Sequence, residues 1–400
     1  MFENKNILIG ISGGIAAYKS LYLVRLFIKS GANVKCIQTP NSKKFVTPLS
    51  LSTLSKNKVF SEFTSDKKNP TWNDHVTISQ WADLFIIAPA TANTISKMAN
   101  GSADNILIAT YLSSKNNIYI APAMDLEMYK DNSTKKNFTI LENNGVKIIY
   151  SDYGELASGL IGEGRMSEPE TIYNFIKSDL LKSLKYYNKK VLITAGPTRE
   201  YIDIMRFISN KSSGKMGSEL SIAFANEGAN VDLILGPSSE NPVHENIDIY
   251  RIETSIEMFN LSKSKFSQYD IIVFTAAVSD FKPLKLVNKK IKKDDFKFSI
   301  NLTKSIDILN ELGKFKKNQF LVGFALENEM KLENAKNKLI KKNLDLIVLN
   351  SLNTKNIDPF SNFNKVKILS KSGRKYDFIL KSKKNIALDI INTIYDETNL

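Results

Sequence analysis

The chain has 400 residues, of which 42% are hydrophobic, and it carries a formal net charge of +14 and one cysteine, Cys36. This length predicts two or three domains with cores of normal size, and a single cysteine excludes a disulfide framework or a thiolate metal cluster. Because the sequence shows neither a charged and then apolar leader nor an apolar run of about 18 residues, we expect a cytoplasmic protein without a membrane span. The lysines are spread along the chain without an aromatic and basic platform, which favours an anionic small-molecule substrate over a nucleic acid.

The first half of the chain alternates apolar, β-rich segments with helical patterns. Helices are expected at Ile15–Ser30, Ser133–Asn143 and Pro169–Leu184. The expected strands are Asn6–Ile11, Val34–Gln38, Leu84–Ala88, Ile118–Ala121 and Val146–Ile149.

The second half shows the same alternation after a lysine-rich stretch, residues 182–190. Near-continuous apolar strands separated by helices are typical of parallel, doubly wound sheets. We therefore predict an α/β protein with two doubly wound, mostly parallel, Rossmann-like domains, which divide near Asn188 into residues 1–187 and 188–400. The expected strands of the second half are Lys190–Thr194, Asn230–Leu235, Ile271–Thr275, Gln319–Phe324, Leu344–Leu349 and Lys365–Leu369.

Glycine-rich and polar loops follow three strands of the first half. The first is Gly10-Ile-Ser-Gly-Gly-Ile-Ala-Ala-Tyr-Lys19, which by itself is about as compatible with a structural turn as with a phosphate site. Ala88-Pro-Ala-Thr-Ala-Asn-Thr94 and Ala121-Pro-Ala-Met-Asp-Leu-Glu-Met128 follow later strands. Because ligands of open α/β sheets bind at the carboxyl ends of strands, these loops are expected to converge on a site. His75 is placed just before a strand, and a lone histidine is more often structural than catalytic.

A long loop opens the second half, from Thr194 to Gly217. The β-rich run Val191–Thr194 enters this loop, and an amphipathic helix, Ser218–Asn226, leaves it. Backbone N–H groups at a helix N-terminus attract phosphate, and Arg206, Lys211 and Lys215 would add positive charge. The loop therefore predicts a second anion site.

These motifs resemble known families. The first glycine-rich turn, His75, Ala88–Thr94, Pro122-Ala-Met-x-x-x-Met and Gly159-x-x-Gly-x-Gly-Arg165 resemble the flavin-containing cysteine decarboxylase family. The Thr194–Gly217 loop resembles the phosphopantothenate–cysteine ligase family. In this order they are similar to the bifunctional phosphopantothenoylcysteine decarboxylase and phosphopantothenate–cysteine ligase family of coenzyme A biosynthesis, over nearly the whole chain.

For the first half, the resemblance implies a flavodoxin-like domain that binds FMN and decarboxylates 4'-phosphopantothenoylcysteine to 4'-phosphopantetheine, with His75 helping to remove the thiol proton. The family has asparagine and cysteine where this chain has Asp125 and Ser158, and both positions are implied to be catalytic. A protonated Asp125 could replace the missing thiol as the final proton donor, which is a hypothesis. The implied FMN residues are Ser12, Gly13, Gly14, Thr39, Thr91, Asn93 and Thr94.

For the second half, the resemblance implies that 4'-phosphopantothenate and L-cysteine are joined with CTP and Mg²⁺ through an acyl-cytidylate. Asn210 and Lys290 are the implied catalytic residues. A lysine run is usually a solvated surface, Asp280 could cap a helix or turn, and Phe324 could belong to the core. No carboxylate cluster identifies metal ligands. The implied CTP residues are Phe274, Thr275, Ala276, Asp280, Lys290, Ser305, Ile306, Asp307, Ile308, Phe324, Lys338 and Lys342.

Two alternatives stay open at this point. The chain could be a ligase whose flavin domain is impaired by Asp125 and Ser158, or a flavin-binding regulatory subunit that inhibits a partner phosphatase. By analogy with the families, we expect a homo-oligomer with trimeric flavin domains and dimeric ligase domains.

Overall fold

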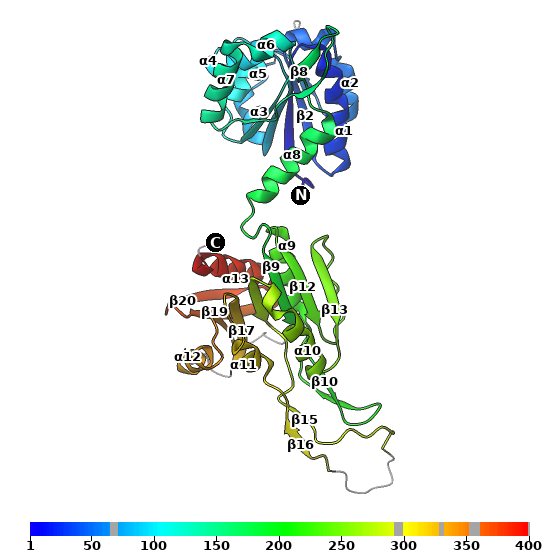
Figure 1. Cartoon of the computed structure of the whole chain (residues 1–400), viewed down its shortest axis with the longest axis vertical. Coiled ribbons are helices and arrows are strands. Elements are labelled where there is room, and N and C mark those ends of the chain that lie inside the picture. Colours follow the sequence, from blue (N-terminus) through cyan, green and yellow to red (C-terminus); the bar gives the residue numbers. More distant parts are fainter. Residues whose placement is uncertain (65–70, 292–298, 328–331, 352–360, 399–400) are drawn as a thin grey trace. The chain divides into compact units, whose positions relative to one another are not determined.

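Two compact units make up the chain in the computed structural model, Met1–Leu180 and Leu181–Leu400 (Figure 1). Each unit has its own sheet and its own core. The structure describes residues 1–64, 71–291, 299–327, 332–351 and 361–398.

Unit 1 is built on a six-stranded parallel sheet in the order β3-β2-β1-β4-β5-β6. Successive side chains of a strand point to opposite faces, so Ile7 and Ile9 enter one core cluster and Leu8 enters another. Both faces are therefore covered, as a parallel sheet requires. The strands are β1 (Asn6–Ile11), β2 (Asn33–Gln38), β3 (Val59–Phe60), β4 (Leu84–Ala90), β5 (Asn117–Pro122) and β6 (Lys147–Ile148).

Helices cover the two faces of this sheet. Leu23 of α1, Leu51 of α2 and Ile172 of α8 join the first cluster, whereas side chains of α3 to α7 join the second. An antiparallel hairpin, β7 (Asp152–Glu155) and β8 (Ile161–Arg165), lies outside the main sheet. The helices are η1 (Ile15–Tyr18), α1 (Lys19–Lys29), η2 (Pro40–Lys44), α2 (Pro48–Ser55), α3 (His75–Trp81), α4 (Ala92–Asn100), α5 (Ile106–Leu112), α6 (Leu126–Lys130), α7 (Asn132–Asn143) and α8 (Pro169–Lys182).

The placement of His75 just before a strand is wrong, because helix α3 begins at this residue and β4 starts only at Leu84. Asp74 caps the helix: its carboxylate accepts hydrogen bonds from the Val76 N–H at 2.9 Å and from the Thr77 hydroxyl. A capping aspartate thus overrides the strand preference of the β-branched residues that follow.

Unit 2 contains an eight-stranded sheet in the order β13-β12-β9-β14-β17-β18-β19-β20. Pairing is parallel from β13 to β18, and the last two strands are antiparallel. The two doubly wound, mostly parallel sheets predicted from the sequence are confirmed. The strands are β9 (Lys190–Ala195), β12 (Asn230–Leu235), β13 (Ile247–Arg251), β14 (Ile271–Phe274), β17 (Phe320–Glu327), β18 (Leu346–Ser351), β19 (Phe363–Ser370) and β20 (Lys375–Ser382).

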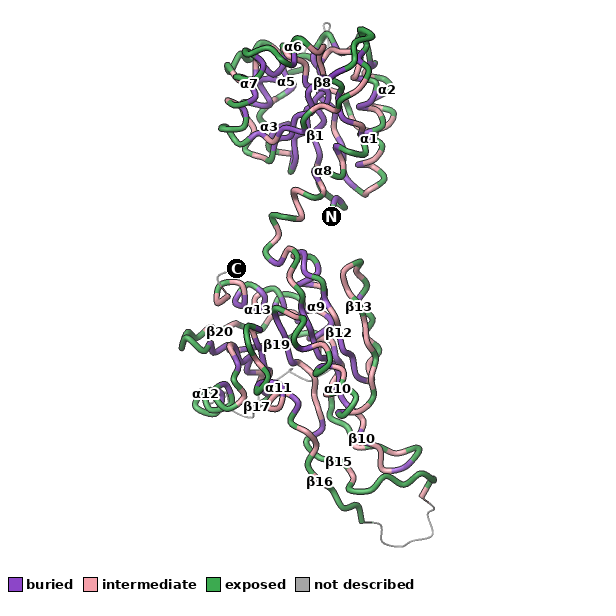
Figure 2. Tube along the Cα trace, viewed as in Figure 1, coloured by how far each residue is buried: buried purple, intermediate pink, exposed green. Residues whose placement is uncertain are grey.

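Apolar side chains of α9 and α13 cover one face of this sheet, and those of α10, α11 and α12 cover the other. Figure 2 shows the buried residues gathered along the strands of each unit. Two short antiparallel pairs, β10 (Arg199–Tyr201) with β11 (Phe207–Ser209) and β15 (Phe281–Pro283) with β16 (Leu302–Lys304), lie outside the sheet. The helices are α9 (Lys215–Asn226), α10 (Ser255–Lys265), η3 (Phe266–Gln268), α11 (Ile308–Gly313), α12 (Leu332–Lys341) and α13 (Lys383–Thr398).

Each sheet has a point at which the strand order reverses, between β1 and β4 in unit 1 and between β9 and β14 in unit 2. Chain connections leave in opposite directions from such a point, so a crevice opens at the carboxyl ends of the two strands. The glycine-rich turn and the Thr194–Gly217 loop both begin at these positions.

Candidate functional site

A cavity of about 540 Å³ lies where the loops after β1, β2 and β4 meet. Gly13 comes from the first loop, Thr39 from the second, and Thr91 from the third. The cavity also contacts Asn41, Lys97, Asp104, Asn105, Ala123, Met124 and Met128. Of the residues implied to hold FMN, it brings together Gly13, Thr39, Thr91, Asn93 and Thr94.

Two features suit this cavity to a bound polar group. The Thr39 hydroxyl is buried and has no hydrogen-bond partner among the described residues, so a ligand atom could satisfy it. A Cβ on Gly13 would lie 2.9 Å from the Cβ of Asn41, which is closer than real side chains approach. Glycine therefore lets the two loops meet and keeps the backbone accessible. These residues fit FMN.

Ser12 lies behind the cavity and does not line it. Its hydroxyl donates to the Pro89 carbonyl at 2.7 Å and accepts from the Thr91 N–H at 3.0 Å. Ser12 is fully buried and joins the loop after β1 to the loop after β4. Its hydroxyl therefore positions Thr91.

An adjoining cavity of about 450 Å³ contains Asp125 and Ser158, and it shares Ala123 and Met124 with the first. Gly14 lines this second cavity, together with residues of η1. The turn of the β7–β8 hairpin supplies Ser158. Asp125 comes from the loop after β5, where its carboxylate accepts from the Leu126 N–H at 2.7 Å and caps α6.

Glycines in β8 explain how the hairpin reaches the Asp125 loop. A Cβ on Gly162 would lie 2.5 Å from Leu126, and one on Gly164 would lie 2.4 Å from the Met124 carbonyl oxygen. Gly164 also has a φ of 125°, which side chains rarely allow, and its carbonyl accepts from the Met124 N–H at 3.0 Å. These contacts place Ser158 and Asp125 on the same cavity.

The charged side chains of Lys19 and Arg165 also line the second cavity. The buried Lys19 ammonium donates to the Met166 carbonyl at 2.8 Å and to Glu168 at 2.9 Å. Glu168 also pairs with Arg165 at 2.8 Å. The hydrogen bond from Lys19 is the main cause that lowers the pKa of Glu168. Lys19 and Arg165 thus supply two cations at this cavity. Neither residue was named as a site residue from the sequence.

His75 lines neither of the two cavities described above. Its ring lies edge-on to Phe63 and Trp72, with ring centres 6.2 and 6.4 Å apart. The Nδ1 atom is buried without a hydrogen-bond partner in the described part of the chain. The imidazole is thus held by aromatic contacts.

In unit 2, a cavity of about 850 Å³ lies at the reversal point of the sheet. It contains Asn210 and the whole 211–217 stretch from the long loop, with Thr275, Ala276 and Asp280 after β14. Phe324, Lys338 and Lys342 line it from β17 and the α12 region. Seven residues implied for the ligase therefore meet at one cavity, together with Lys211, Lys215 and Gly217 of the long loop.

Close approach of backbone shapes this cavity. A Cβ on Gly217 would lie 2.3 Å from the Ala195 Cβ, so only glycine lets α9 begin so near β9. The Asn210 side-chain amide donates to the Val278 carbonyl at 2.8 Å. This hydrogen bond fixes the orientation of the Asn210 side-chain amide, including its own carbonyl oxygen.

Several residues implied for CTP do not line the cavity. Phe274 is 8% exposed and belongs to the core beneath it. Asp307 caps α11 and also pairs with Lys342 at 2.9 Å. The Ser305 hydroxyl is buried with no partner among the residues described. Ile306 and Ile308 pack into the same core cluster as Phe274.

Lys290 is exposed and lies away from the cavity lining. Its segment is attached to the loop between β10 and β11: the Ile291 N–H donates to Asp203 at 3.2 Å, and the Val287 N–H donates to the Ile202 carbonyl at 3.1 Å. Lys292 and Lys293, in the same lysine run, lie outside the described residues.

Other lining residues were not named as site residues from the sequence. In unit 1, Lys97 and Asp104 form an ion pair at the first cavity, and both lie in a polar stretch that the sequence makes visible. In unit 2, Asn364 and Lys383 reach the cavity from β19 and α13. No motif marks these two, because the antiparallel end of the sheet brings them there.

The described ranges contain neither a cluster of potential metal ligands nor a helix suited to cross a membrane. No group of three or more histidine, cysteine, aspartate or glutamate side chains is arranged to hold a metal ion there. Among the helices of those ranges, none combines the length and the apolar character that a bilayer crossing requires.

Comparison with known proteins gives consistent matches along the chain. Residues 1–181 match the family model described as Flavoprotein, and residues 186–397 match the DNA/pantothenate metabolism flavoprotein C-terminal domain. The chain is 40% identical to the coenzyme A biosynthesis bifunctional protein CoaBC of Bacillus subtilis over 98% of this chain and 97% of that protein. It is 46% identical to a cysteine/cysteine sulfinic acid decarboxylase from an unknown prokaryotic organism, over 87% of this chain and 98% of that protein. A crystal structure of the C-terminal domain of a CoaBC protein shares 34% identity and a TM-score of 0.46, over 54% of this chain and 97% of that one.

Proposed function

This chain belongs to the family of bifunctional coenzyme A biosynthesis proteins, and from that premise we propose that it joins 4'-phosphopantothenate to L-cysteine and decarboxylates the product to 4'-phosphopantetheine. Residues 188–400, which lie within unit 2, would be the CTP-dependent ligase, and residues 1–187, which include unit 1, would be the FMN-dependent decarboxylase. The observation that carries the proposal is the pair of polar cavities, one at the reversal point of each sheet. The use of CTP would place the reaction in the cytoplasm.

The ligase reaction needs an activated acyl group. The pantothenate carboxylate oxygen would attack the α-phosphorus of CTP and displace pyrophosphate, and the cysteine amine would then attack the acyl carbon, displace CMP and lose a proton. Asn210, fixed by Val278, would hold the acyl group. The N-terminus of α9 together with Lys338 and Lys342 would neutralise phosphate oxygens, because fixed donors and cations stabilise developing negative charge.

Mg²⁺ would enter with the triphosphate, since this ion is commonly bound through substrate phosphates and a few carboxylates. Asp280 is the carboxylate that lines the cavity. Lys290 would reach the bound nucleotide only if its segment moved toward the cavity. Its catalytic role stays a prediction.

In the decarboxylase, FMN would supply the two-electron oxidation of the substrate and its later reversal. Gly13, Thr39, Thr91, Asn93 and Thr94 would hold the cofactor at the first cavity. The adjoining cavity would hold the cysteine end of the substrate, where Asp125 and Ser158 face the same space. His75 would take the thiol proton. Because His75 lines neither of these cavities, the histidine would have to be supplied by another copy of the chain or be moved to the cavity by a rearrangement.

One assay tests both halves. Purified protein receives FMN, phosphopantothenate, cysteine, CTP and Mg²⁺, and pyrophosphate and carbon dioxide are measured together. Both products are expected in equal amounts, and both should disappear without CTP. Absence of pyrophosphate would contradict the ligase.

Pyrophosphate without carbon dioxide would select a second candidate, a ligase with an inactive flavin domain. The observation that favours it is Asp125, because a carboxylate at the second cavity would repel the carboxylate that the substrate must lose. Carbon dioxide from cysteine without CTP would instead show free cysteine as the substrate, the activity in the name of the relative from an unknown prokaryotic organism.

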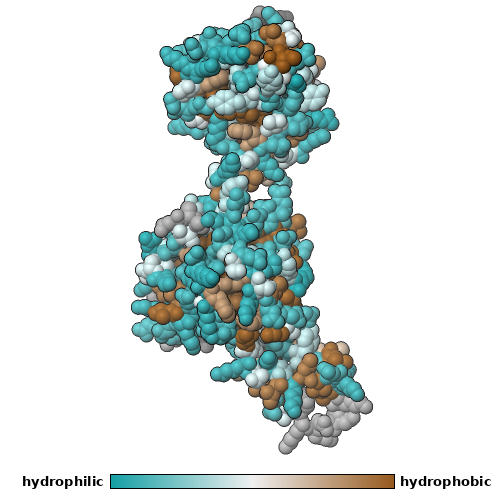
Figure 3. Space-filling model, viewed as in Figure 1, coloured by the Kyte–Doolittle hydropathy of each residue, from teal (hydrophilic) through white to brown (hydrophobic). Residues whose placement is uncertain are grey.

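We also propose that copies of unit 2 pair through an apolar surface around β15 and β16. Met205, Phe281, Leu284, Leu286 and Leu302 are each about half exposed or more. Figure 3 shows hydrophobic residues gathered on this part of unit 2. An apolar patch of this kind marks an interaction site. Replacing Leu286 with glutamate should lower the mass found by light scattering, and an unchanged mass would contradict the pairing. Trimeric association of unit 1 stays a prediction by analogy.

A further inference from the structure

A second cavity of unit 2, of about 700 Å³, has no role in the function proposed so far. It lies between the Ser212–Ser213 stretch, the loop after β12 and the residues that follow β13. Ser212 and Ser213 also line the larger cavity, so the two cavities adjoin across this stretch of backbone. A molecule held in the second cavity would lie beside the group held in the first.

The cavity combines two guanidinium groups with two carboxylates: Arg199, Arg251, Glu253 and Glu257. Arg251 is committed to the loop after β12, because it donates to the carbonyls of Ser238 at 3.3 Å and Glu240 at 3.1 Å. Glu257 accepts from the Glu253 N–H at 2.8 Å and so fixes the start of the following helix. These two side chains shape the wall.

Arg199 and Glu253 are less tightly engaged with each other. Their ion pair spans 3.9 Å, well beyond the 2.7–2.9 Å typical of a charge-assisted hydrogen bond. The Arg199 guanidinium lies over the Phe207 ring, 4.6 Å from its centre, and Tyr201 donates to the Glu253 carboxylate. Both charges are thus held in place on the cavity wall.

We propose that this cavity binds the amino-acid substrate of the ligase as a zwitterion, with its carboxylate on Arg199 and its ammonium group on Glu253. The inference rests on the proposed ligase function and adds a binding site to it. An α-amino acid carries one charge of each sign, which matches this wall. A phosphate carries negative charge only, so it would match the two arginines of this wall but not the two carboxylates. The ammonium group would lose a proton to Glu253, and the neutral amine would then attack the acyl carbon held in the larger cavity, which shares Ser212 and Ser213 with this one.

The test compares two amines as acyl acceptors, cysteine and cysteamine, which lacks the carboxylate. The wild-type protein is expected to show a higher kcat/KM for cysteine. Arg199→Gln should lower the ratio of the two kcat/KM values by about tenfold or more, because a hydrogen bond to a charged group is lost. Glu253→Gln should raise the KM for both amines and leave their ratio unchanged within about twofold. A ratio does not depend on how much of a preparation is folded.

The activation of phosphopantothenate by CTP can be measured separately from the attack of the amine. Exchange of labelled pyrophosphate into CTP, with phosphopantothenate and no amine, reports activation alone. It is expected to stay within about twofold of wild type in both variants. Wild-type protein that shows no exchange would sink the proposed ligase function itself, which is a different failure from that of the amino-acid site.

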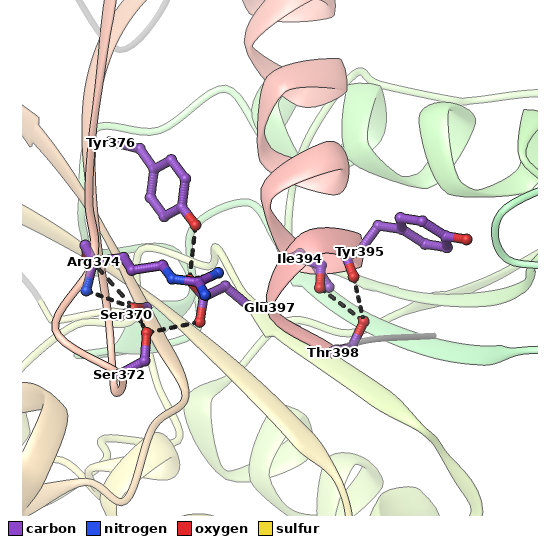
Figure 4. A network of polar contacts seen from close by, with 8 residues as sticks. All are labelled: Ser370, Ser372, Arg374, Tyr376, Ile394, Tyr395, Glu397 and Thr398. Atoms are coloured by element: carbon purple, nitrogen blue, oxygen red, sulfur yellow. Dashed lines mark hydrogen bonds and ion pairs between the residues drawn. The ribbon is translucent and has the colours of Figure 1, made fainter.

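A matched control uses another arginine–glutamate pair of unit 2. Arg374 and Glu397 lie 3.7 Å apart between the β19–β20 turn and α13, in the network that Figure 4 shows. Arg374→Gln removes the same charge from a side chain that is 65% exposed, and it should leave the ratio and the exchange rate unchanged.

Three results would overturn the proposal. The first is a wild-type protein that does not prefer cysteine to cysteamine. The second is Arg199→Gln with normal exchange and an unchanged ratio. The third is exchange that falls in parallel with ligation, which would assign the cavity to the nucleotide. If Arg199→Gln does not fold, an unchanged KM for cysteine in Glu253→Gln also overturns it.

Discussion

A carboxyl side chain and a hydroxyl side chain line the second cavity of unit 1. By the resemblance noted in the sequence, Ser158 takes the place of a cysteine and Asp125 takes the place of an asparagine. A carboxylic acid donates a proton readily, whereas a serine hydroxyl does not. Because the two side chains face one cavity, one change can compensate for the other.

Replacing Asp125 with asparagine should therefore stop the reaction before the final reduction. Asp125→Asn is expected to release the enethiol, which has two hydrogens fewer than 4'-phosphopantetheine, and mass spectrometry of the products would show it. The rate of saturated product should fall by roughly 10²-fold or more, the usual effect of losing a general acid. The double variant Asp125→Asn with Ser158→Cys should restore the saturated product. Unchanged product from the single variant would rule out Asp125 as the donor.

The thiol of Cys36 tests the packing of unit 1. Burial raises the pKa of Cys36 from about 9.0 to about 12, and a hydrogen bond with Ser55 offsets only part of this. The group is fully buried in the core of β2. Below pH 9 the thiol is protonated in both the folded and the unfolded chain, and the free energy of unfolding keeps the full contribution of the buried thiol. As pH rises from 9 towards 12, the unfolded chain loses this proton first, so the free energy of unfolding should fall. Urea unfolding across this range should show a steeper fall for wild type than for Cys36→Ala. Rapid reaction of the native protein with an aromatic disulfide reagent at pH 8 would contradict the burial.

Sequence patterns identify the cavity residues of loops at strand ends better than the cavity residues that come from elements far along the chain. Gly13, Thr39, Thr91 and Asn210 line cavities because each follows a strand end directly, which a sequence pattern can reveal. Lys383 reaches the large cavity of unit 2 only through the antiparallel end of the sheet, which no local pattern encodes. The roles of all these residues stay predictions.

At the scale of elements, the alternation of apolar strands and helices is strong enough to predict both sheets. Each predicted strand is present with small shifts at its ends. Strand β20 was missed because its alternating exposed and half-buried residues resemble a polar surface segment. Helix α3 was missed because a capping aspartate decides its start more than the residues inside it.

The β7–β8 hairpin offers a test of close packing between elements. Gly164→Ala would place a methyl group 2.4 Å from the Met124 carbonyl oxygen at a φ of 125°, so the hairpin must shift away from the Asp125 loop. Carbon dioxide release should fall by about tenfold or more, since a displacement of about 1 Å at a reacting group can cost up to 10²-fold. Pyrophosphate release by unit 2 in the same preparation should not change.

Gly145→Ala is the matched control for this change. Gly145 also has a positive φ, of 82°, but a Cβ there would meet nothing within 4 Å among the described residues. It carries the backbone strain, of about 1 kcal/mol, without the collision. Equal loss of carbon dioxide release in both variants would show that strain alone explains the effect.

At the scale of the whole molecule, each unit has its own pair of hydrophobic clusters around its own sheet. A protein of this kind is expected to unfold in two steps, because each core supports its own cooperative transition. Ligands then identify the steps, since a ligand stabilises only the unit that binds it.

FMN should raise the midpoint of one calorimetric transition, and CTP with Mg²⁺ should raise the other. A ligand at about 100 times its Kd stabilises the folded state by roughly 2.7 kcal/mol, which corresponds to about 5–10 °C for domains of this size. The Thr39→Val variant should reduce the FMN shift and leave the CTP shift intact, because the unpartnered Thr39 hydroxyl lies only at the flavin cavity. A single transition that both ligands move together would contradict independent cores. Two transitions of which neither responds to FMN would contradict the flavin site, because a cofactor bound to the native unit must shift its unfolding equilibrium.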